Sequence, residues 1–554
     1  MSNFNSKNNR DRVKELFDIL TSTEASIDLT ACIAKLKGVL DSTENISIVL
    51  LGSFADGKTS TIAGLMGEVL DDMKIDSDES SDELIIYRPH NLKKGYVIID
   101  TPGLFGTKEQ EIDGEKVQLS DKTIKFISEA HIVMYVTSAV APVKESHGPI
   151  LKRVLRDLDK LDSTIFVLNK MDETGANITN EEAFGQMAKI KKQFLIDRLE
   201  NIIGLTPDEA QTLKVVCISA DPKRKGVQTW LQTPEKYMQL SRIGTLQDSL
   251  NNVVATANPE KLRADAYAAS LKDVMYTFAY IYNQYTIPLQ KIISETKEDL
   301  EELNGHLVRN RYALIKTKGE MTRQLDGLRQ SLLQKIMESS YEEMGTILQN
   351  DIGVEGGKVT YYVVQANVNA ILSDCCMSNR TSLDFTWEEM KTKFEKEDGM
   401  FKEIVGQGVG FLKNVDNKAV LAARDAFFKS YKFKPWGAVK LADKIGKVGA
   451  GIQIAAAAYE VFKEWKRNQE LKKAKKNLTD AISKYFSAVY KLMGNDDDYF
   501  KNFAPTYGEM VDILAERKSQ IGQLTHKLTS VEALKSRVSV FYGTNIEDVE
   551  FEEL

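Results

Sequence analysis

The chain has 554 residues, of which 42% are hydrophobic and 28% charged, and its formal net charge is −7. A single core rarely grows to this size, so we expect at least two domains. Its four cysteines lack metal-binding spacing and argue against a disulfide framework: Cys32, Cys217, Cys375 and Cys376. The polar N-terminus does not resemble a signal peptide, and no stretch has the ~20 apolar residues of a membrane-spanning helix. We therefore expect a protein of the reducing cytoplasm.

Residues 10–41 are expected to form an amphipathic helix that is broken near Ser22. Apolar residues recur there at helical spacing with charges between them: Val13, Leu16, Phe17, Leu20, Ile27, Ile33, Leu36 and Leu40. The apolar face of the N-terminal segment, residues 1–44, must be buried against other residues. We expect those residues to come from a helical body formed later in the chain.

Residues 46–60 have the pattern of a phosphate-binding loop. The apolar run Ile46–Leu51 predicts a buried strand, and Ala63, Leu65 and Met66 begin a helical stretch. Between them the chain fits G-x-x-x-x-G-K-[ST], with Gly52, Gly57, Lys58 and Thr59 at the fixed positions. Glycines let backbone N–H groups converge on phosphate oxygens at the positive end of the helix. Lys58 is expected to reach the β- and γ-phosphates, and the Thr59 hydroxyl to bind Mg²⁺.

A second buried strand is predicted at Tyr96–Asp100, and it is followed by Thr-Pro-Gly103. An aspartate at such a strand end can hold Mg²⁺ through water, and the Gly103 amide can face a γ-phosphate. We therefore expect metal binding by Thr59 and Asp100. The expected catalytic residues are Lys58, Thr59, Asp100 and Gly103.

A third predicted strand begins at Thr164 and ends in the pattern N-K-x-D, formed by Asn169, Lys170 and Asp172. The Asp172 carboxylate can pair with the two N–H groups on the Watson–Crick edge of guanine, whereas adenine would leave it facing a lone pair. Asn169 and the stem of Lys170 are expected to steady the loop and cover the ring.

A fourth predicted strand, from Lys214, places Ser219 and Ala220 where a backbone amide can contact the guanine oxygen. Each motif alone is weak, but four in order, each after an apolar run, indicate guanine-nucleotide binding. Residues 45–257 thus resemble the G domain of regulatory GTPases, a mostly parallel sheet between helices with GTP or GDP and Mg²⁺ as cofactors. The expected nucleotide-binding residues are Gly52, Ser53, Asp56, Gly57, Lys58, Thr59, Ser60, Asn169, Lys170, Asp172, Ser219 and Ala220.

Several departures from this pattern predict slow hydrolysis of GTP. The phosphate loop carries Phe54, Ala55 and Asp56 at positions that are small or polar in fast enzymes, and Leu104 replaces the glutamine that orients water in many GTPases. The first switch is expected in Leu70–Glu83, an acidic stretch without threonine that offers only Ser77, Ser80 or Ser81 as a hydroxyl. Without nucleotide this stretch is expected to be a mobile, solvated loop. The second switch is expected at Thr107–Gly114.

After Asn258-Pro259, helical periodicity replaces any strand pattern. A seven-residue repeat of Ile293, Leu300, Leu307, Leu314, Met321 and Leu328 predicts one long helix from about Pro288 to Gln349. Seven-spaced rows between Leu514 and Val538 predict a helix antiparallel to it, and residues 471–492 add another. One chain has enough helices to cover the seam, so a helical bundle is favoured over a two-chain coiled coil.

Residues 400–476 differ from the rest, because they hold 17 Lys and Arg against 7 Asp and Glu. Glycine- and alanine-rich apolar stretches flanked by lysines and aromatic residues are typical of segments that bind an anionic lipid surface. A buried helical hairpin at the end of the bundle is an equal alternative, and no nucleic-acid-binding motif is present. The residues expected to contact membrane lipid are Val409, Phe411, Leu412, Ile452 and Ile454.

This layout resembles the dynamin superfamily, and specifically the bacterial dynamin-like proteins. The motifs at Gly52–Thr59, Asp100–Gly103 and Asn169–Asp172 carry the resemblance, and the rest matches by layout. It implies a G domain joined to an elongated all-α stalk, self-association through the G domain, and a related dynamin-like partner. The expected domains are 1–44 (neck), 45–257 (G domain), 258–399 (stalk), 400–476 (tip) and 477–554 (returning helices).

Two functions remain open. In the first, the chain is a GTPase, peripheral to a membrane, that couples nucleotide state to membrane remodelling or vesiculation. In the second, it is a nucleotide-gated scaffold or signalling protein with little turnover whose helical body binds another protein.

Overall fold

The computed structural model describes residues 6–22, 27–41, 45–53, 56–70, 85–88, 96–100, 126–256, 259–408 and 468–544. The chain divides into two compact units, residues 1–286 with 529–554 (unit 1) and residues 287–528 (unit 2). Several predicted features lie outside the described residues. They are residues 71–83 of the first switch, the whole second switch, Phe54, Ala55, Gly103, Leu104, and the lipid-binding set Val409, Phe411, Leu412, Ile452 and Ile454.

Unit 1 contains a six-stranded sheet with the strand order β2-β3-β1-β4-β5-β6. All neighbouring strands pair in parallel except β2 with β3. Its strands are β1 (Ile46–Leu51), β2 (Ile85–Tyr87), β3 (Tyr96–Asp100), β4 (Ile132–Ser138), β5 (Thr164–Asn169) and β6 (Lys214–Cys217). Strands β4 and β5 are buried along almost their whole length, as expected for strands with helices on both faces. The predicted mostly parallel sheet is therefore confirmed, and β2 and β4 are additions to the four predicted strands.

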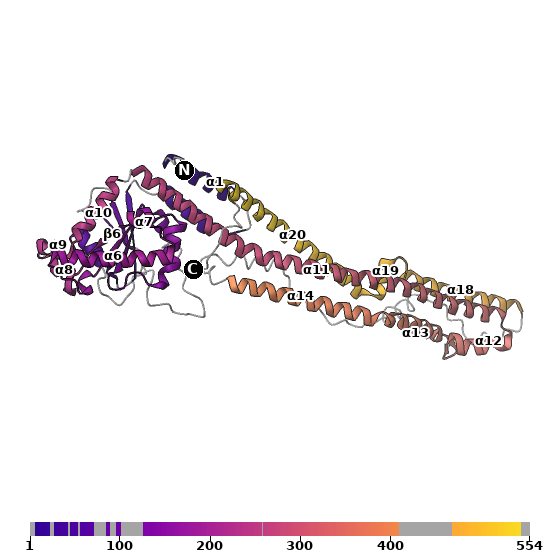
Figure 1. Cartoon of the computed structure of the whole chain (residues 1–554). Coiled ribbons are helices and arrows are strands. Elements are labelled where there is room, and N and C mark those ends of the chain that lie inside the picture. The colour runs from indigo at the N-terminus through magenta and orange to yellow at the C-terminus, as the bar shows by residue number, and fades with distance from the viewer. Residues whose placement is uncertain are drawn as a thin grey trace. The chain divides into compact units, whose positions relative to one another are not determined.

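Helices surround this sheet in Figure 1, and their apolar residues form one core with it. These helices are α3 (Lys58–Met66), α5 (Gly148–Lys152), α6 (Glu181–Ile203), α7 (Pro207–Thr212), α8 (Val227–Trp230), α9 (Pro234–Ser241) and α10 (Ile243–Thr256). Short helical segments connect them at η2 (Glu145–His147), η3 (Arg153–Asp157), η4 (Leu161–Ser163), η5 (Met171–Thr174) and η6 (Pro222–Arg224).

A second hydrophobic cluster in unit 1 joins segments from both ends of the chain. Helix α1 (Ser6–Thr21) ends at the predicted break, and α2 (Thr30–Asp41) follows it. Their apolar faces pack against residues 271–282 of α11 (Pro259–Glu338) and residues 531–538 of α20 (Pro505–Tyr542). The N-terminal helices are thus covered by helices that come later in the chain.

Unit 2 is almost entirely helical within the described residues. Besides parts of α11 and α20 it contains α12 (Tyr341–Ile347), η7 (Leu348–Ile352), α13 (Tyr362–Ser378), α14 (Arg380–Gly408), α18 (Asn468–Leu492) and α19 (Asp496–Phe503). The predicted seven-residue row is buried from Ile293 to Met321. The fold class is therefore confirmed, because the chain contains a large helical region as well as the α/β domain.

Two local predictions in this region were wrong. Helix α11 spans 80 residues with Pro288 inside it, so the helix neither begins at that proline nor continues to Gln349. A proline in a helix removes one backbone hydrogen bond, which tertiary packing has to offset here. In addition, β7 (Val354–Glu355) and β8 (Lys358–Val359) form a hairpin where no strand was predicted. Gly356 and Gly357, both with positive φ, make its turn.

Buried polar side chains fix how the helices of unit 2 align. The Asn310 side chain donates to the Thr386 hydroxyl at 2.9 Å, and Asn379 donates to the Thr317 hydroxyl at 2.6 Å. At a partly exposed position, Lys393 pairs with Asp299 at 2.7 Å. A sliding helix would break these contacts and leave buried polar groups unpaired, so they select one register.

Candidate nucleotide-binding site

The predicted site residues gather at the carboxyl ends of the parallel strands in unit 1. Strand β1 lies between β3 and β4, so the strand order reverses beside it. In open parallel sheets, ligands bind outside the carboxyl ends of the strands at such a reversal. The phosphate loop leaves β1 there, Asp100 ends β3, and Asn169 ends β5.

Two glycines let the phosphate loop follow its path. A Cβ on Gly52 would lie 2.1 Å from the Val136 carbonyl oxygen, and one on Gly57 would lie 2.4 Å from Asn169 Nδ2. Both residues also have positive φ, of 151° and 81°. The loop is therefore packed directly against β4 and the end of β5, where only glycine fits.

Lys58 is held inside the phosphate loop. Its Nζ donates to the carbonyl oxygens of Gly52 and Ser53 at 3.0 and 3.1 Å, and the side chain is buried. Burial lowers the pKa of Lys58, while Asp100 and Asp56 act in the opposite direction. Ser60 lies half-buried in the first turn of α3, after Thr59. An ammonium group fixed at the N-terminus of a helix is suited to neutralising phosphate oxygens.

Thr59 and Asp100 meet at the start of α3. The Thr59 hydroxyl donates to Asp100 Oδ2 at 3.3 Å. The other carboxylate oxygen, Asp100 Oδ1, is buried and has no hydrogen-bond partner among the described residues. Burial raises the pKa of Asp100, and Lys58 opposes this shift. A hydroxyl beside a carboxylate with an unsatisfied oxygen fits the ligand set of Mg²⁺, which prefers oxygen ligands and retains several waters.

Asp56 folds back onto the loop that contains it. Its Oδ2 accepts from the Ser53 amide at 3.0 Å, and the side chain is buried. Burial raises the pKa of Asp56, and the Ser53 amide and Lys58 partly offset the effect. The carboxylate therefore satisfies a main-chain donor of the loop, a role that its position in the sequence did not indicate.

Asn169 ties three loops together. Its Nδ2 donates to the Asp56 carbonyl at 2.9 Å, and its Oδ1 accepts from the amides of Lys170 and Ala220 at 2.8 and 2.9 Å. An amide side chain carries both donors and an acceptor, which a carboxylate or a hydrocarbon cannot supply together. The asparagine thus fixes the phosphate loop relative to the loops after β5 and β6.

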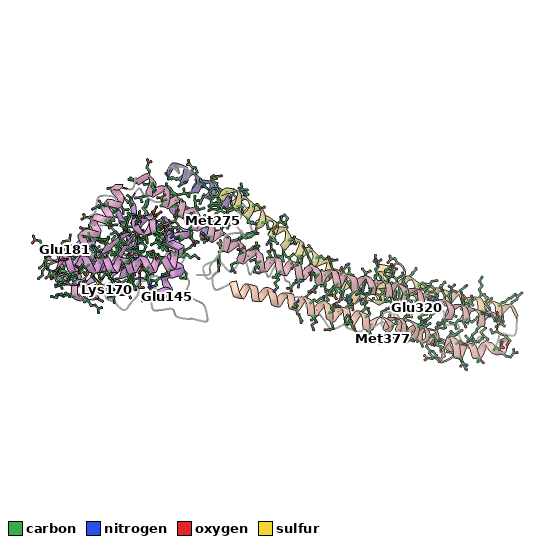
Figure 2. The ribbon with its side chains drawn as sticks, viewed as in Figure 1. Glu145, Lys170, Glu181, Met275, Glu320 and Met377 are labelled. Carbon is green, nitrogen blue, oxygen red and sulfur yellow. The ribbon has the colours of Figure 1, made fainter. Side chains whose placement is uncertain are left out.

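The loop after Asn169 presents Lys170 and Asp172. Lys170, labelled in Figure 2, has a left-handed backbone with φ of 61°. Asp172 Oδ2 accepts from the Lys223 amide at 2.7 Å, and the Asp172 amide donates to the Ser219 hydroxyl at 3.1 Å. These contacts orient the carboxylate that is expected to face guanine.

One expected contact with the base does not fit the structure. The Ser219 amide donates to the Ser241 carbonyl at 2.9 Å, and the Ala220 amide donates to Asn169 Oδ1 at 2.9 Å. Neither amide is therefore available to the guanine oxygen in this arrangement. The Ser219-Ala220 segment instead supports the N-K-x-D loop.

The sequence patterns missed two residues behind the phosphate loop. His147 of η2 and Tyr135 of β4 are buried there, and His147 contacts the Ser53 hydroxyl. A single histidine 94 residues away in sequence from its serine partner belongs to no local motif. Only the parallel packing of β1 and β4 brings the two together.

Several solved structures are similar to this chain at low sequence identity. No curated protein matched the chain. Among solved structures, the LeoA bacterial dynamin GTPase from ETEC is 28% identical over 97% of this chain and 98% of that one, with a TM-score of 0.36. An oligomerised bacterial dynamin pair, described as a mechanism for long-range sensing and tethering of membranes, is 13% identical over 98% of this chain and 82% of that one, with a TM-score of 0.28. Toc33 from Arabidopsis thaliana with GDP and Mg²⁺ is 16% identical over 39% of this chain and 93% of that one, with a TM-score of 0.24.

Two family models match the chain in adjacent regions. The dynamin family model matches residues 68–171, and the dynamin-like helical domain model matches residues 205–528. The second match alone covers more than half of the 554 residues. No helix among the described residues combines the length and apolar character needed to span a membrane. The chain belongs to the dynamin family, with a GTPase-type α/β domain and a dynamin-like helical domain.

Proposed function

We propose that this chain binds GTP with Mg²⁺ at the carboxyl edge of the sheet and hydrolyses it slowly to GDP and phosphate. The observation that carries the proposal is the pairing of Thr59 with Asp100, whose second oxygen is buried and unsatisfied among the described residues. Lys58 and the loop amides would hold the phosphates, and Thr59 and Asp100 would hold Mg²⁺. Asp172, oriented by Lys223, would select guanine.

The proposed reaction is attack of water on the γ-phosphorus with loss of GDP. Bound Mg²⁺ would neutralise charge on the β- and γ-phosphates. Positioning and electrostatics supply most of phosphoryl-transfer catalysis. Leu104 stands where many GTPases have a water-orienting glutamine, so a second G domain or another partner would have to complete the site.

A GTP-hydrolysis assay with Mg²⁺ tests this proposal, with Lys58→Ala as the control. We expect slow release of phosphate by the wild type and at least tenfold less by Lys58→Ala, because the lysine contributes more than one charged hydrogen bond. Binding measured by titration with GTP and ATP should show a preference for GTP that Asp172→Ala removes. Equal hydrolysis by wild type and Lys58→Ala would reject the enzyme assignment.

We also propose that nucleotide state is coupled to membrane remodelling through residues 400–476. Support comes from membership of the dynamin family and from the basic, apolar composition of this segment. Val409, Phe411, Leu412, Ile452 and Ile454 are the proposed lipid contacts. Self-association through the G domain and pairing with a related dynamin-like protein belong to the same proposal.

Co-sedimentation with anionic liposomes separates this proposal from a nucleotide-gated scaffold. Wild type is expected to sediment with the vesicles, and a variant with Phe411→Asp and Leu412→Asp to remain in the supernatant. A matched double change to aspartate at the exposed residues Tyr312 and Met337 of α11 should leave lipid binding intact. Absence of lipid binding in every nucleotide state would favour the scaffold.

A further inference from the structure

A buried polar chain lies directly behind the phosphate loop. The Ser53 hydroxyl is 3.1 Å from His147 Nε2, and the Tyr135 hydroxyl is 2.9 Å from His147 Nδ1. Ser53, Tyr135 and His147 are each at least 96% buried. They come from the phosphate loop, from β4 and from η2, so the chain joins three elements of the G domain.

The main chain of Ser53 contacts two side chains on the nucleotide side of the loop. Its amide donates to Asp56 Oδ2 at 3.0 Å, and its carbonyl accepts from Lys58 Nζ at 3.1 Å. A shift of Ser53 would therefore move both the carboxylate and the ammonium group of the loop. The Asp56 carbonyl is in turn held by Asn169.

A neutral imidazole is suited to this position. Burial, with a smaller contribution from Lys144, lowers the pKa of His147 to about 4, so the ring is uncharged at neutral pH. A neutral ring has one N–H donor and one acceptor nitrogen, and it can therefore satisfy the two hydroxyl groups of Ser53 and Tyr135 together. Both hydroxyls can donate or accept, so either tautomer completes the chain.

A second serine–histidine pair lies at the other end of β1, where His131 is buried and Ser47 is half-buried. The Ser47 hydroxyl is 2.8 Å from His131 Nδ1, and burial also lowers the pKa of His131 to about 4. Ser47 lies near the start of β1, whereas Ser53 follows its end. Both pairs join a serine hydroxyl to a histidine nitrogen, but the Ser47 pair lies away from the phosphate loop and is less buried.

We propose that His147 is a positioning residue for nucleotide binding, which holds the phosphate loop in its binding conformation through the Ser53 hydroxyl. This inference rests on the proposed function, because the bound ligand is the triphosphate of GTP. His147 would not touch the nucleotide. Its effect would reach the phosphates through Ser53, Asp56 and Lys58.

The test is a double-mutant cycle on GTP affinity in the full-length protein. Ser53→Ala and His147→Leu are each expected to weaken binding about tenfold, since each leaves a buried partner unsatisfied at the loop. The double variant should bind GTP no more weakly than His147→Leu alone. The reason is that both single variants and the double variant lose the same contact, between the Ser53 hydroxyl and His147. His147→Gln, which keeps a donor and an acceptor, should recover most of the affinity.

The matched control is the pair at the other end of β1. His131→Leu and Ser47→Ala should lower the thermal unfolding temperature but keep GTP affinity within about twofold of wild type. The proposal would be overturned if the loss of GTP affinity in the double variant equalled the product of the losses in Ser53→Ala and His147→Leu. It would also be overturned if His131→Leu lost as much GTP affinity as His147→Leu. If His147→Leu does not fold, Ser53→Ala alone tests the proposal, because it removes only one oxygen atom.

A readout without nucleotide separates this proposal from the proposed function. Hydrogen exchange of the peptide spanning residues 48–60 is expected to be faster in Ser53→Ala and His147→Leu than in wild type, and unchanged in His131→Leu. Unchanged exchange in the first two variants would overturn the positioning role. If the wild type bound no more GTP than Lys58→Ala, the proposed function itself would be refuted.

Discussion

The steric limits at single residues explain why the phosphate loop needs its glycines. Gly52 and Gly57 are closed to any side chain by the Val136 carbonyl and the Asn169 amide group. Gly185 in α6 is different, because no heavy atom that the structure describes lies within 4 Å of a Cβ built there. The two kinds of glycine look alike in the sequence but differ in what surrounds them.

Gly52→Ala should therefore destabilise unit 1 by about 3 kcal/mol, since it combines backbone strain with a clash against a main-chain oxygen. Gly185→Ala should stabilise it by about 1 kcal/mol, because alanine favours the helix interior. Urea unfolding followed by circular dichroism measures both. Equal effects of the two substitutions would contradict this assignment of the glycines.

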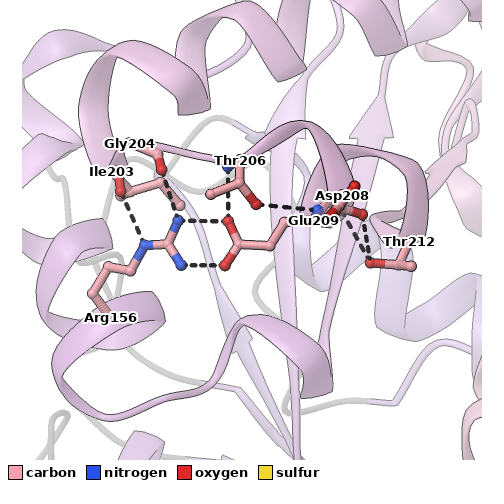
Figure 3. A network of polar contacts seen from close by, with 7 residues as sticks. All are labelled: Arg156, Ile203, Gly204, Thr206, Asp208, Glu209 and Thr212. Atoms are coloured by element: carbon pink, nitrogen blue, oxygen red, sulfur yellow. Dashed lines mark hydrogen bonds and ion pairs between the residues drawn. The ribbon is translucent and has the colours of Figure 1, made fainter.

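At the scale of elements, one ion pair joins the end of α6, the start of α7 and η3, as Figure 3 shows. Arg156 donates to both oxygens of Glu209 at 2.6 and 2.8 Å and to the carbonyl of Ile203 at 2.9 Å. Glu209 also accepts from the Thr206 amide in a capping box. The carbonyls of Ile203 and Gly204 at the end of α6 and the amide of Thr206 before α7 are thus satisfied by one pair of side chains.

This pair makes stability depend on pH. The hydrogen bond from Arg156, followed by that from the Thr206 amide, lowers the pKa of Glu209 to about 2 from its ordinary value of 4.5. Because the folded state holds the proton less tightly, the stabilisation is present above pH 4.5 and is lost as pH falls toward 2. Glu209→Gln should cost about 1 kcal/mol at pH 7.

Unfolding measured between pH 7 and 2.5 checks the prediction. The stability difference between wild type and Glu209→Gln should shrink as the pH falls below 4.5. Glu145, paired at 3.6 Å with Arg198 and 90% exposed, offers a control, because Glu145→Gln should leave the pH profile unchanged. Parallel profiles for wild type and Glu209→Gln would show that the pair does not contribute.

At the scale of the whole molecule, unit 1 gathers the two ends of the chain around α11. Asp273 of α11 lies in this assembly and pairs with Lys35 of α2 at 2.8 Å and with Arg153 of η3 at 3.5 Å. Lys35 and Asp273 are almost fully buried, and Lys35 also donates to Thr277. One carboxylate therefore joins the N-terminal helices, α11 and the G domain.

Asp273→Asn should destabilise unit 1 by about 3–5 kcal/mol, because it leaves the Lys35 ammonium buried without its counter-charge. Adding Lys35→Met should restore much of this loss, since it removes the unpaired charge. Lys272→Met is the matched control on the same helix, because its pair with Asp159 is exposed and contributes less than about 1 kcal/mol. Thermal unfolding measures the stability of each variant. A loss of stability no larger in Asp273→Asn than in Lys272→Met would contradict the stabilising role of Asp273.

Local patterns along the chain were enough to predict several of its elements. The apolar runs at Ile46–Leu51, Tyr96–Asp100 and Thr164–Asn169 coincide with β1, β3 and β5, because a strand buried on both faces needs a continuous apolar run. The seven-residue row of α11 predicted a buried seam, since helical spacing alone decides which residues share a face. Family membership followed from motifs with fixed spacing and was confirmed by the comparisons.

The pairing of side chains that are distant in sequence became visible only in the folded chain. The contacts of Ser53 with His147, of Lys35 with Asp273 and of Asn169 with Asp56 join residues 94, 238 and 113 positions apart. No periodicity encodes such pairs, because they depend on strand order and on how helices close over the sheet. For the same reason the amides of Ser219 and Ala220 turned out to hold the loops rather than to face the base. Local patterns specify elements, whereas the geometry of a buried polar site arises when those elements pack.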